Sequence, residues 1–142
     1  MINLAIIDTR PNIYKVGIWK ELYKSKSINS HVFFCCEDGV NDEFYDKTFN
    51  TYRRSDTWLL NDFSFSFPKD YSFFNNIFLR YINPTVFLGI LRGEFDIVLV
   101  QGYNHFMYVF SMIVARARGA KVIFRGEAVL RGNEHEFTIK NF

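Results

Sequence analysis

One stretch of the chain, from Glu94 to Leu130, constrains the fold most, because it predicts a strand, a helix and a second strand in direct succession. The run Ile97–Val100 is apolar on both faces, which is typical of a strand inside a parallel sheet. A second short run, Lys121–Phe124, predicts the next strand. Two strands joined by a helix in this way run parallel, with a right-handed crossover. The stretch therefore predicts an α/β fold.

The helix between these strands is predicted from apolar residues at helical spacing. Gly119 is expected to end this helix, because glycine readily adopts the left-handed conformation that closes many helices. Arg116 and Arg118 stand in the last turn, where cations interact favourably with the helix dipole. The apolar residues of the helix are Phe106, Val109, Phe110, Ile113 and Ala117.

Three further strands are predicted upstream. Leu4–Ile7 and His31–Cys36 are short apolar runs, and Phe63–Phe67 alternates strictly between phenylalanine and serine. Strict alternation predicts a strand with one buried face. The long connection Asn41–Asp62 is polar and aromatic without a clear period. Connections of this length tend to be functional or poorly ordered.

Three further helices are predicted in the same part of the chain. The first follows the turn Thr9–Asn12, and the second begins at Ser72 and carries the aromatic residues from Phe73 to Tyr81. We expect these aromatic side chains in the core rather than at a membrane. The third begins at Asn83, where the following proline suits a first helical turn. The order of elements predicts a Rossmann-like three-layer sandwich with a mostly parallel sheet.

The composition favours a folded domain and narrows the class of partner. A chain of 142 residues that is 49% hydrophobic can bury a core of its own. The net charge of +2, without a dense run of lysine and arginine, gives no reason to expect nucleic acid. No apolar run reaches the length of a membrane span, and the first residues do not resemble a signal peptide, so we expect a cytoplasmic protein.

The two cysteines, Cys35 and Cys36, are adjacent, and the chain has no second pair with which to form a metal site. We expect both to be buried, inert thiols in a reducing compartment. Neither a metal nor a cofactor is expected.

The loop after Val100 contains the first candidates for ligand binding, because ligands of parallel α/β sheets bind beyond the carboxyl ends of the strands. The candidates are Gln101, Gly102, Tyr103 and Asn104. The alternative is that Gly102 only turns the chain and Tyr103 only covers the core.

Charged candidates follow two other strands. The planar guanidinium of Arg125 suits a phosphate group. The alternative is that Arg125 and Glu127 neutralise each other as an exposed ion pair, which would contribute little to stability. Arg10 is a further binding candidate, whereas Asp8 is expected to cap the next helix rather than act as a catalytic carboxylate. No residue is assigned a catalytic role.

Several phrases, taken in order and spacing, resemble the N-terminal domain of GT-B glycosyltransferases, in particular those of family four. The main phrases are Phe95–Asn104 and Gly119–Glu127, which are similar to the family's apolar strand, His-Gly-Tyr-like turn, helix and strand ending in Arg-Gly-Glu. Weaker similarities lie at Trp58–Leu60, at Asn83-Pro84 and at Leu91–Gly93. The resemblance implies a Rossmann-like domain over residues 1–131 and leaves a loose C-terminal tail over residues 132–142.

The resemblance implies a retaining, metal-free transfer of sugar from a nucleotide-sugar to a glycan or lipid-linked acceptor. In such enzymes the N-terminal domain mainly holds the acceptor, and a C-terminal domain holds most of the nucleotide. This chain would then be about half of an enzyme, inactive without a C-terminal half. A lipid-linked acceptor would bring it into peripheral contact with the inner face of the membrane. The alternative is a non-catalytic Rossmann-like module that binds a partner protein or a small ligand.

Two positions depart from the family. Gln101 stands where relatives often carry histidine, and glutamine donates hydrogen bonds but neither carries charge nor acts as a general base. The residues Asp8–Pro11 stand where some relatives have a glycine-rich loop. Since this loop contains neither G-x-G-x-x-G nor a Walker motif, dinucleotide and nucleoside-triphosphate binding of the usual kinds are not expected.

Overall fold

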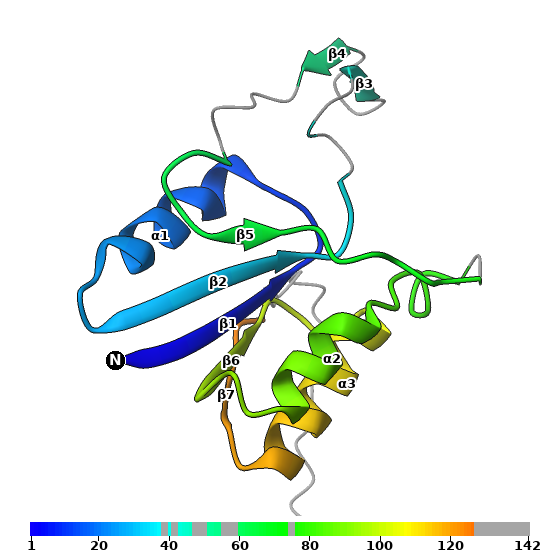
Figure 1. Cartoon of the computed structure of the whole chain (residues 1–142). Coiled ribbons are helices and arrows are strands. Elements are labelled where there is room, and N and C mark those ends of the chain that lie inside the picture. The colour runs from blue at the N-terminus through cyan, green and yellow to red at the C-terminus, as the bar shows by residue number, and fades with distance from the viewer. Residues whose placement is uncertain (38–39, 41–42, 47–50, 55–59, 74–75, 127–142) are drawn as a thin grey trace, which may run out of the picture.

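A five-stranded parallel sheet forms the middle layer of the structure, a computed structural model that describes residues 1–37, 40, 43–46, 51–54, 60–73 and 76–126 (Figure 1). The strand order is β5-β2-β1-β6-β7, and every neighbouring pair runs parallel. Strands β2 and β5 lie on one side of β1, and β6 and β7, which come later in the chain, lie on the other side. The strand order therefore reverses between β1 and β6, and the predicted α/β sandwich is confirmed. The strands are β1 Ile2–Asp8, β2 Ile28–Phe34, β5 Phe65–Ser66, β6 Ile97–Val100 and β7 Lys121–Phe124.

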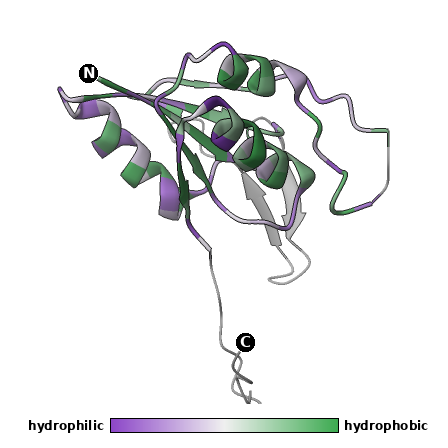
Figure 2. Cartoon of the chain, turned by 90° about the horizontal axis from the view of Figure 1, so that it is seen from below, coloured by the Kyte–Doolittle hydropathy of each residue, from purple (hydrophilic) through white to green (hydrophobic). Residues whose placement is uncertain are grey.

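Helices cover both faces of the sheet and make the outer layers. Helix α1 (Ile13–Lys24) packs on one face, and helices α2 (Pro84–Leu91) and α3 (Phe106–Arg118) pack on the other. Strand β1 serves both cores, because Leu4 and Ile6 pack with Trp19 of α1, whereas Ala5 and Ile7 pack with the α2–α3 layer. In Figure 2 the strands between the two layers are mostly apolar, whereas the helices also carry polar residues.

The helix ends follow the sequence signals in part. The side chain of Asn12 caps α1, since its Oδ1 accepts a hydrogen bond from the Tyr14 backbone N–H at 2.9 Å. Gly119 closes α3 in the left-handed conformation, with φ of 91°, as predicted. Asn83 stands at the N-cap of α2, but its side chain makes no cap hydrogen bond and instead donates to the Pro68 carbonyl at 2.8 Å.

The predicted helix from Ser72 to Tyr81 is wrong, because the described residues of this stretch form turns, bends and irregular backbone. Asp70 accepts hydrogen bonds from the backbone N–H groups of Ser72 and Ile82, at 2.9 and 2.8 Å. Asn76 accepts one from the backbone N–H of Phe78 at 2.8 Å. Short polar side chains that bond to nearby backbone offer it an alternative to the helix. These local bonds override the apolar spacing.

The stretch between β2 and β5 departs from the predicted unpatterned connection. It contains a separate antiparallel pair, β3 (Glu43–Asp46) and β4 (Thr51–Arg54). The predicted strand Phe63–Phe67 is shorter than expected, since only Phe65–Ser66 pair with β2. Its buried face is present, because the rings of Phe63, Phe65 and Phe67 pack around Phe34 with centroids 5.6 to 6.4 Å away.

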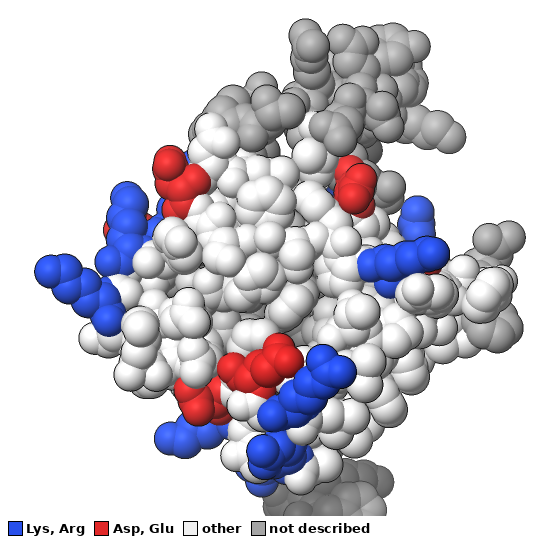
Figure 3. Space-filling model, viewed as in Figure 1, with Lys and Arg blue, Asp and Glu red and all other residues white. Residues whose placement is uncertain are grey.

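The surface mixes charges of both signs. On the face seen in Figure 3, basic and acidic side chains lie around the margin and the middle is uncharged. Within the described ranges, every helix is too short or too polar to cross a membrane.

Candidate functional site

A hollow of about 360 Å³ opens at the carboxyl edge of the sheet, beside the point where the strand order reverses. Parallel α/β sheets bind ligands at this position, because neighbouring loops diverge there. The hollow, called the switch-point pocket below, draws on the loop after β1, the first turn of α1, the loop after β6, the start of α3 and the loop after β7. Its lining residues are Thr9, Lys15, Gln101, Gly102, Tyr103, Asn104, His105, Tyr108 and Gly126.

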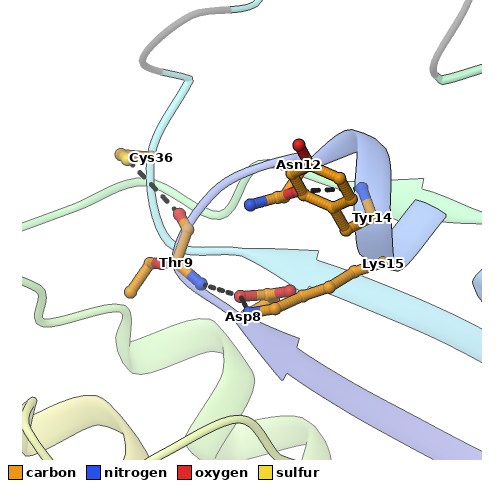
Figure 4. Close-up of polar contacts among 6 residues, drawn as sticks. All are labelled: Asp8, Thr9, Asn12, Tyr14, Lys15 and Cys36. Atoms are coloured by element: carbon orange, nitrogen blue, oxygen red, sulfur yellow. Dashed lines mark hydrogen bonds and ion pairs between the residues drawn. The ribbon is translucent and has the colours of Figure 1, made fainter. Parts of the chain in front are cut away.

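Asp8, the last residue of β1, lies buried beside the pocket with a side chain that is only 1% exposed. Its Oδ1 accepts a hydrogen bond from the Thr9 backbone N–H at 2.9 Å and pairs with the Lys15 ammonium at 3.3 Å (Figure 4). Its Oδ2 is buried without a hydrogen-bond partner among the described residues. Burial raises the pKa of this carboxyl above its ordinary value, and the Lys15 charge opposes that rise.

The expected capping role of Asp8 is wrong. The side chain of Asn12 caps α1, while Asp8 turns inward against Lys15 of the first turn of that helix (Figure 4). Three residues separate the strand end from the cap, so the carboxylate at the strand end lies beneath the helix start rather than at its N-cap.

Gln101 presents a second unsatisfied atom on the neighbouring strand end. Its Nε2 is buried without a hydrogen-bond partner among the described residues. Ile7 and Val100 are register partners, so Asp8 and Gln101 are the next residues along two adjacent parallel strands. One offers a free acceptor and the other a free donor. Buried polar atoms are normally paired, so these two are candidates for a hydrogen bond with a ligand or a water molecule.

Tyr108 and Gly102 shape the floor of the pocket. Burial raises the pKa of the Tyr108 phenol, and the negative charge of Asp8 raises it further. The phenol therefore keeps its proton. A Cβ added at Gly102 would lie 3.1 Å from the Asn104 side chain and 3.5 Å from the Tyr108 ring. The absence of a side chain at Gly102 thus lets the loop pack closely on α3.

The mouth of the pocket carries more exposed groups. Tyr103 is 70% exposed, and its ring lies 6.1 Å from that of Phe124 at the end of β7. Asn104 is also exposed, whereas His105 is buried at the N-cap of α3. The Nδ1–H of His105 donates to the carbonyl oxygen of Ile77 at 2.8 Å.

The structure brings four of the sequence-predicted site residues together, namely Gln101, Gly102, Tyr103 and Asn104. Arg125 is exposed and does not line the pocket, but its positive charge acts on Asp8. Arg10 is exposed and is likewise not a lining residue. Glu127, and with it the predicted pairing with Arg125, lies outside the described residues, as does the predicted tail over 132–142.

Four lining residues were not predicted from the sequence as part of a site, namely Thr9, Lys15, His105 and Tyr108. One signal could have indicated Lys15. A helix that follows a parallel strand begins at the carboxyl edge, so the polar residues of its first turn lie near the switch point.

The pocket offers hydrogen-bonding groups and one ammonium group, and the described part of the chain contains no cluster of three or more His, Cys, Asp or Glu residues that could hold a metal ion. Cys35 is buried, which raises the pKa of its thiol, and the Cys36 thiol donates to the Thr9 carbonyl at 3.3 Å. Such a site can bind and orient a polar ligand. A comparison of the chain with protein-family models, with curated proteins and with solved structures found no match.

Proposed function

We propose that this chain is the acceptor-side half of a retaining glycosyltransferase of the GT-B class, which transfers sugar from a nucleotide-sugar to a glycan or lipid-linked acceptor. One observation carries the proposal. The four residues of the phrase that resembles the family, Gln101 to Asn104, line a pocket at the switch point of the sheet. Ligand sites of open α/β sheets lie at that point.

The chemistry of the pocket suits a polyhydroxylated ligand. The Gln101 Nε2 is a buried donor without a partner among the described residues, and the amide of Asn104 offers both a donor and an acceptor. Each sugar hydroxyl likewise donates and accepts. A site built to hydrogen-bond hydroxyl groups discriminates strongly against ligands that lack them, because its buried polar groups are otherwise left unpaired.

The proposal includes a second domain that carries the nucleotide-sugar, so this chain alone transfers no sugar. Apolar side chains stand exposed where such a domain would close over the pocket. Tyr14 in the first turn of α1 is 87% exposed, Tyr103 is 70% exposed and Phe124 is 48% exposed. Aromatic residues such as tyrosine and phenylalanine are enriched in interfaces between proteins.

Ligand-observed NMR with a panel of glycans, lipid-linked sugars and nucleotide-sugars tests this function. We expect glycans or lipid-linked sugars to bind, and Gln101→Leu and Asn104→Ala to weaken that binding. The matched control is Asn61→Ala, an exposed asparagine outside the pocket. Failure of every sugar to bind, or equal loss in the control, contradicts the proposal, as does robust sugar transfer by the isolated chain.

The competing function is a non-catalytic Rossmann-like module, which the same exposed aromatic residues favour. It predicts that Tyr14→Ser and Tyr103→Ser abolish capture of one protein partner, while no sugar binds. If the chain is instead half of a glycosyltransferase, sugar should bind, and that binding should depend on Gln101 and Asn104. A pull-down and the NMR panel on the same variants separate the two functions.

A further inference from the structure

Lys15 both lines the pocket and pairs with a buried carboxylate, and this sets it apart from the ion-paired Lys24. It lines the switch-point pocket, and it is also the cation that faces the buried Asp8 at 3.3 Å. The side chains of Lys15 and Asp8 are only 17% and 1% exposed. On the same helix, the Lys24–Glu21 pair is 63% and 74% exposed. Water screens the second pair far more than the first.

The groups around Asp8 leave little spare positive charge. Lys15 of α1 and Arg125 after β7 stabilise its carboxylate form. Tyr108 of α3 and Cys35 after β2 also lie within its electrostatic reach, and both are held neutral by burial. The carboxylate and the Lys15 ammonium together are neutral, and water screens the charge of the exposed Arg125, so an anion added at Lys15 would still be repelled by the Asp8 carboxylate.

We propose that the switch-point pocket binds an oxyanion, such as a phosphate group, at Lys15, and that Asp8 takes up one proton from solvent as the anion binds. The proton goes to Oδ2, the carboxyl oxygen that faces no donor among the described residues. The neutral carboxyl no longer repels the anion, so Lys15 can turn its charge toward the ligand. The direction of the Asp8 pKa in the free protein, already raised by burial, favours this uptake.

The inference concerns the pocket of the proposed function, but it does not depend on which sugar binds there. The phosphate could belong to a nucleotide-sugar or to a phosphorylated acceptor, since both carry the same group. Binding of a nucleoside diphosphate and of a sugar phosphate, measured side by side, identifies the source.

Sulfate is the probe for the coupling between anion binding and protonation of Asp8, because sulfate does not titrate in the range where a carboxyl group does. The carboxyl carbon of Asp8 is followed by NMR as a function of pH, with sulfate or with sodium chloride at matched ionic strength. We expect sulfate to raise the midpoint of the Asp8 titration. Between the free and bound pKa values, sulfate affinity should fall by up to about tenfold per pH unit as pH rises.

Three variants complete the test. Lys15→Met should lose sulfate binding, and Asp8→Asn should keep it while losing its dependence on pH. The matched control is Lys24→Met, which removes an ion-paired lysine from the exposed side of α1 and should leave sulfate affinity unchanged. An unchanged Asp8 midpoint at saturating sulfate overturns the inference even if no variant folds, and so does the absence of sulfate binding. Neither outcome touches the glycan panel that tests the proposed function.

Discussion

Two polar clusters on the same sheet differ in how well their hydrogen bonds are satisfied. At the β5 edge, the two ring nitrogens of His31 bond with Ser64 Oγ at 2.6 Å and Ser66 Oγ at 2.9 Å. At the switch point, Asp8 Oδ2 and Gln101 Nε2 are buried with no partner among the described residues. Natural proteins pair nearly all of their buried polar groups. The first cluster therefore has a structural role, and the second is where a ligand is expected.

Substitution in the hydrogen-bonded His31 cluster should change the free energy of unfolding more than substitution of Gln101 at the switch point. Strand β5 pairs with β2 over only two residues, so the His31 bonds add to the packing of the phenylalanine rings on Phe34 in holding this edge. The ring of His31 also packs on Phe33 with centroids 4.6 Å apart. We expect His31→Ala to lower the free energy of unfolding by about 2 kcal/mol. Urea denaturation measures it.

The control for this variant is Asn29→Ala, an exposed position on the same strand. If both variants lose equally little stability, the His31 cluster does not hold the β5 edge, and its contrast with the switch point fails.

The unsatisfied cluster should respond in the opposite direction. Gln101→Leu keeps much of the side-chain volume and removes the buried amide donor that has no described partner. We expect the free energy of unfolding to rise by about 1 kcal/mol, because the desolvation penalty of that donor disappears. The same variant should lose affinity for sugars. A loss of stability instead would indicate that the Gln101 amide is satisfied in solution, for example by an ordered water molecule.

The two clusters should also respond oppositely to pH. Burial lowers the pKa of His31 below its ordinary value of 6.5, so the unfolded chain binds that proton more readily. The contribution of His31 is present above pH 6.5 and is lost as pH falls through its folded pKa. Burial raises the pKa of Asp8 above 3.8, so its contribution is present below pH 3.8 and is lost as pH rises through its folded pKa.

Stability curves of two variants against pH separate these contributions. Relative to the wild-type protein, His31→Gln should lose less stability on acidification, whereas Asp8→Asn should gain less. Urea denaturation at a series of pH values gives both differences. A curve for Asp8→Asn that runs parallel to the wild-type curve would show that Asp8 titrates alike in the folded and unfolded chain.

The sequence predicted the parts of the fold where local and tertiary signals agree. Strands β6 and β7 coincide with the predicted runs Ile97–Val100 and Lys121–Phe124, and Gly119 closes α3 as expected. The prediction failed between Ser72 and Tyr81, where the apolar spacing fits a helix but Asp70 and Asn76 bond to the backbone. The spacing of apolar residues indicates which side chains would share one face of a helix, but it contains no information about such competing hydrogen bonds.

The candidate site also contains residues that the sequence could place and residues that it could not. Gln101 and its three neighbours could be placed because they directly follow a strand, and the end of a parallel strand defines the site. Tyr108 could not be placed, because it reaches the pocket from a helix, and for Lys15 the sequence could indicate only that it lies near the switch point. How the helices that carry these two residues are rotated about their axes depends on buried contacts of residues such as Trp19 and Met107, which involve distant parts of the chain.

The smallest effect is expected for Lys24→Met. Comparing it with Lys15→Met tests whether burial, rather than the ion pair itself, gives the Lys15–Asp8 pair its larger contribution to stability. The Lys24–Glu21 pair has the shorter distance, 2.7 Å against 3.3 Å for Lys15–Asp8, yet both of its partners are exposed. Exposed pairs contribute little, because water screens them and two long side chains must be ordered to form them. Lys24→Met should therefore leave the urea midpoint unchanged at low and high salt, whereas Lys15→Met should lower it, because a buried carboxylate loses its counterion. Equal changes in both variants would mean that the carboxylate of Asp8 is as well hydrated as that of Glu21, and the electrostatic basis of proton-linked anion binding would disappear.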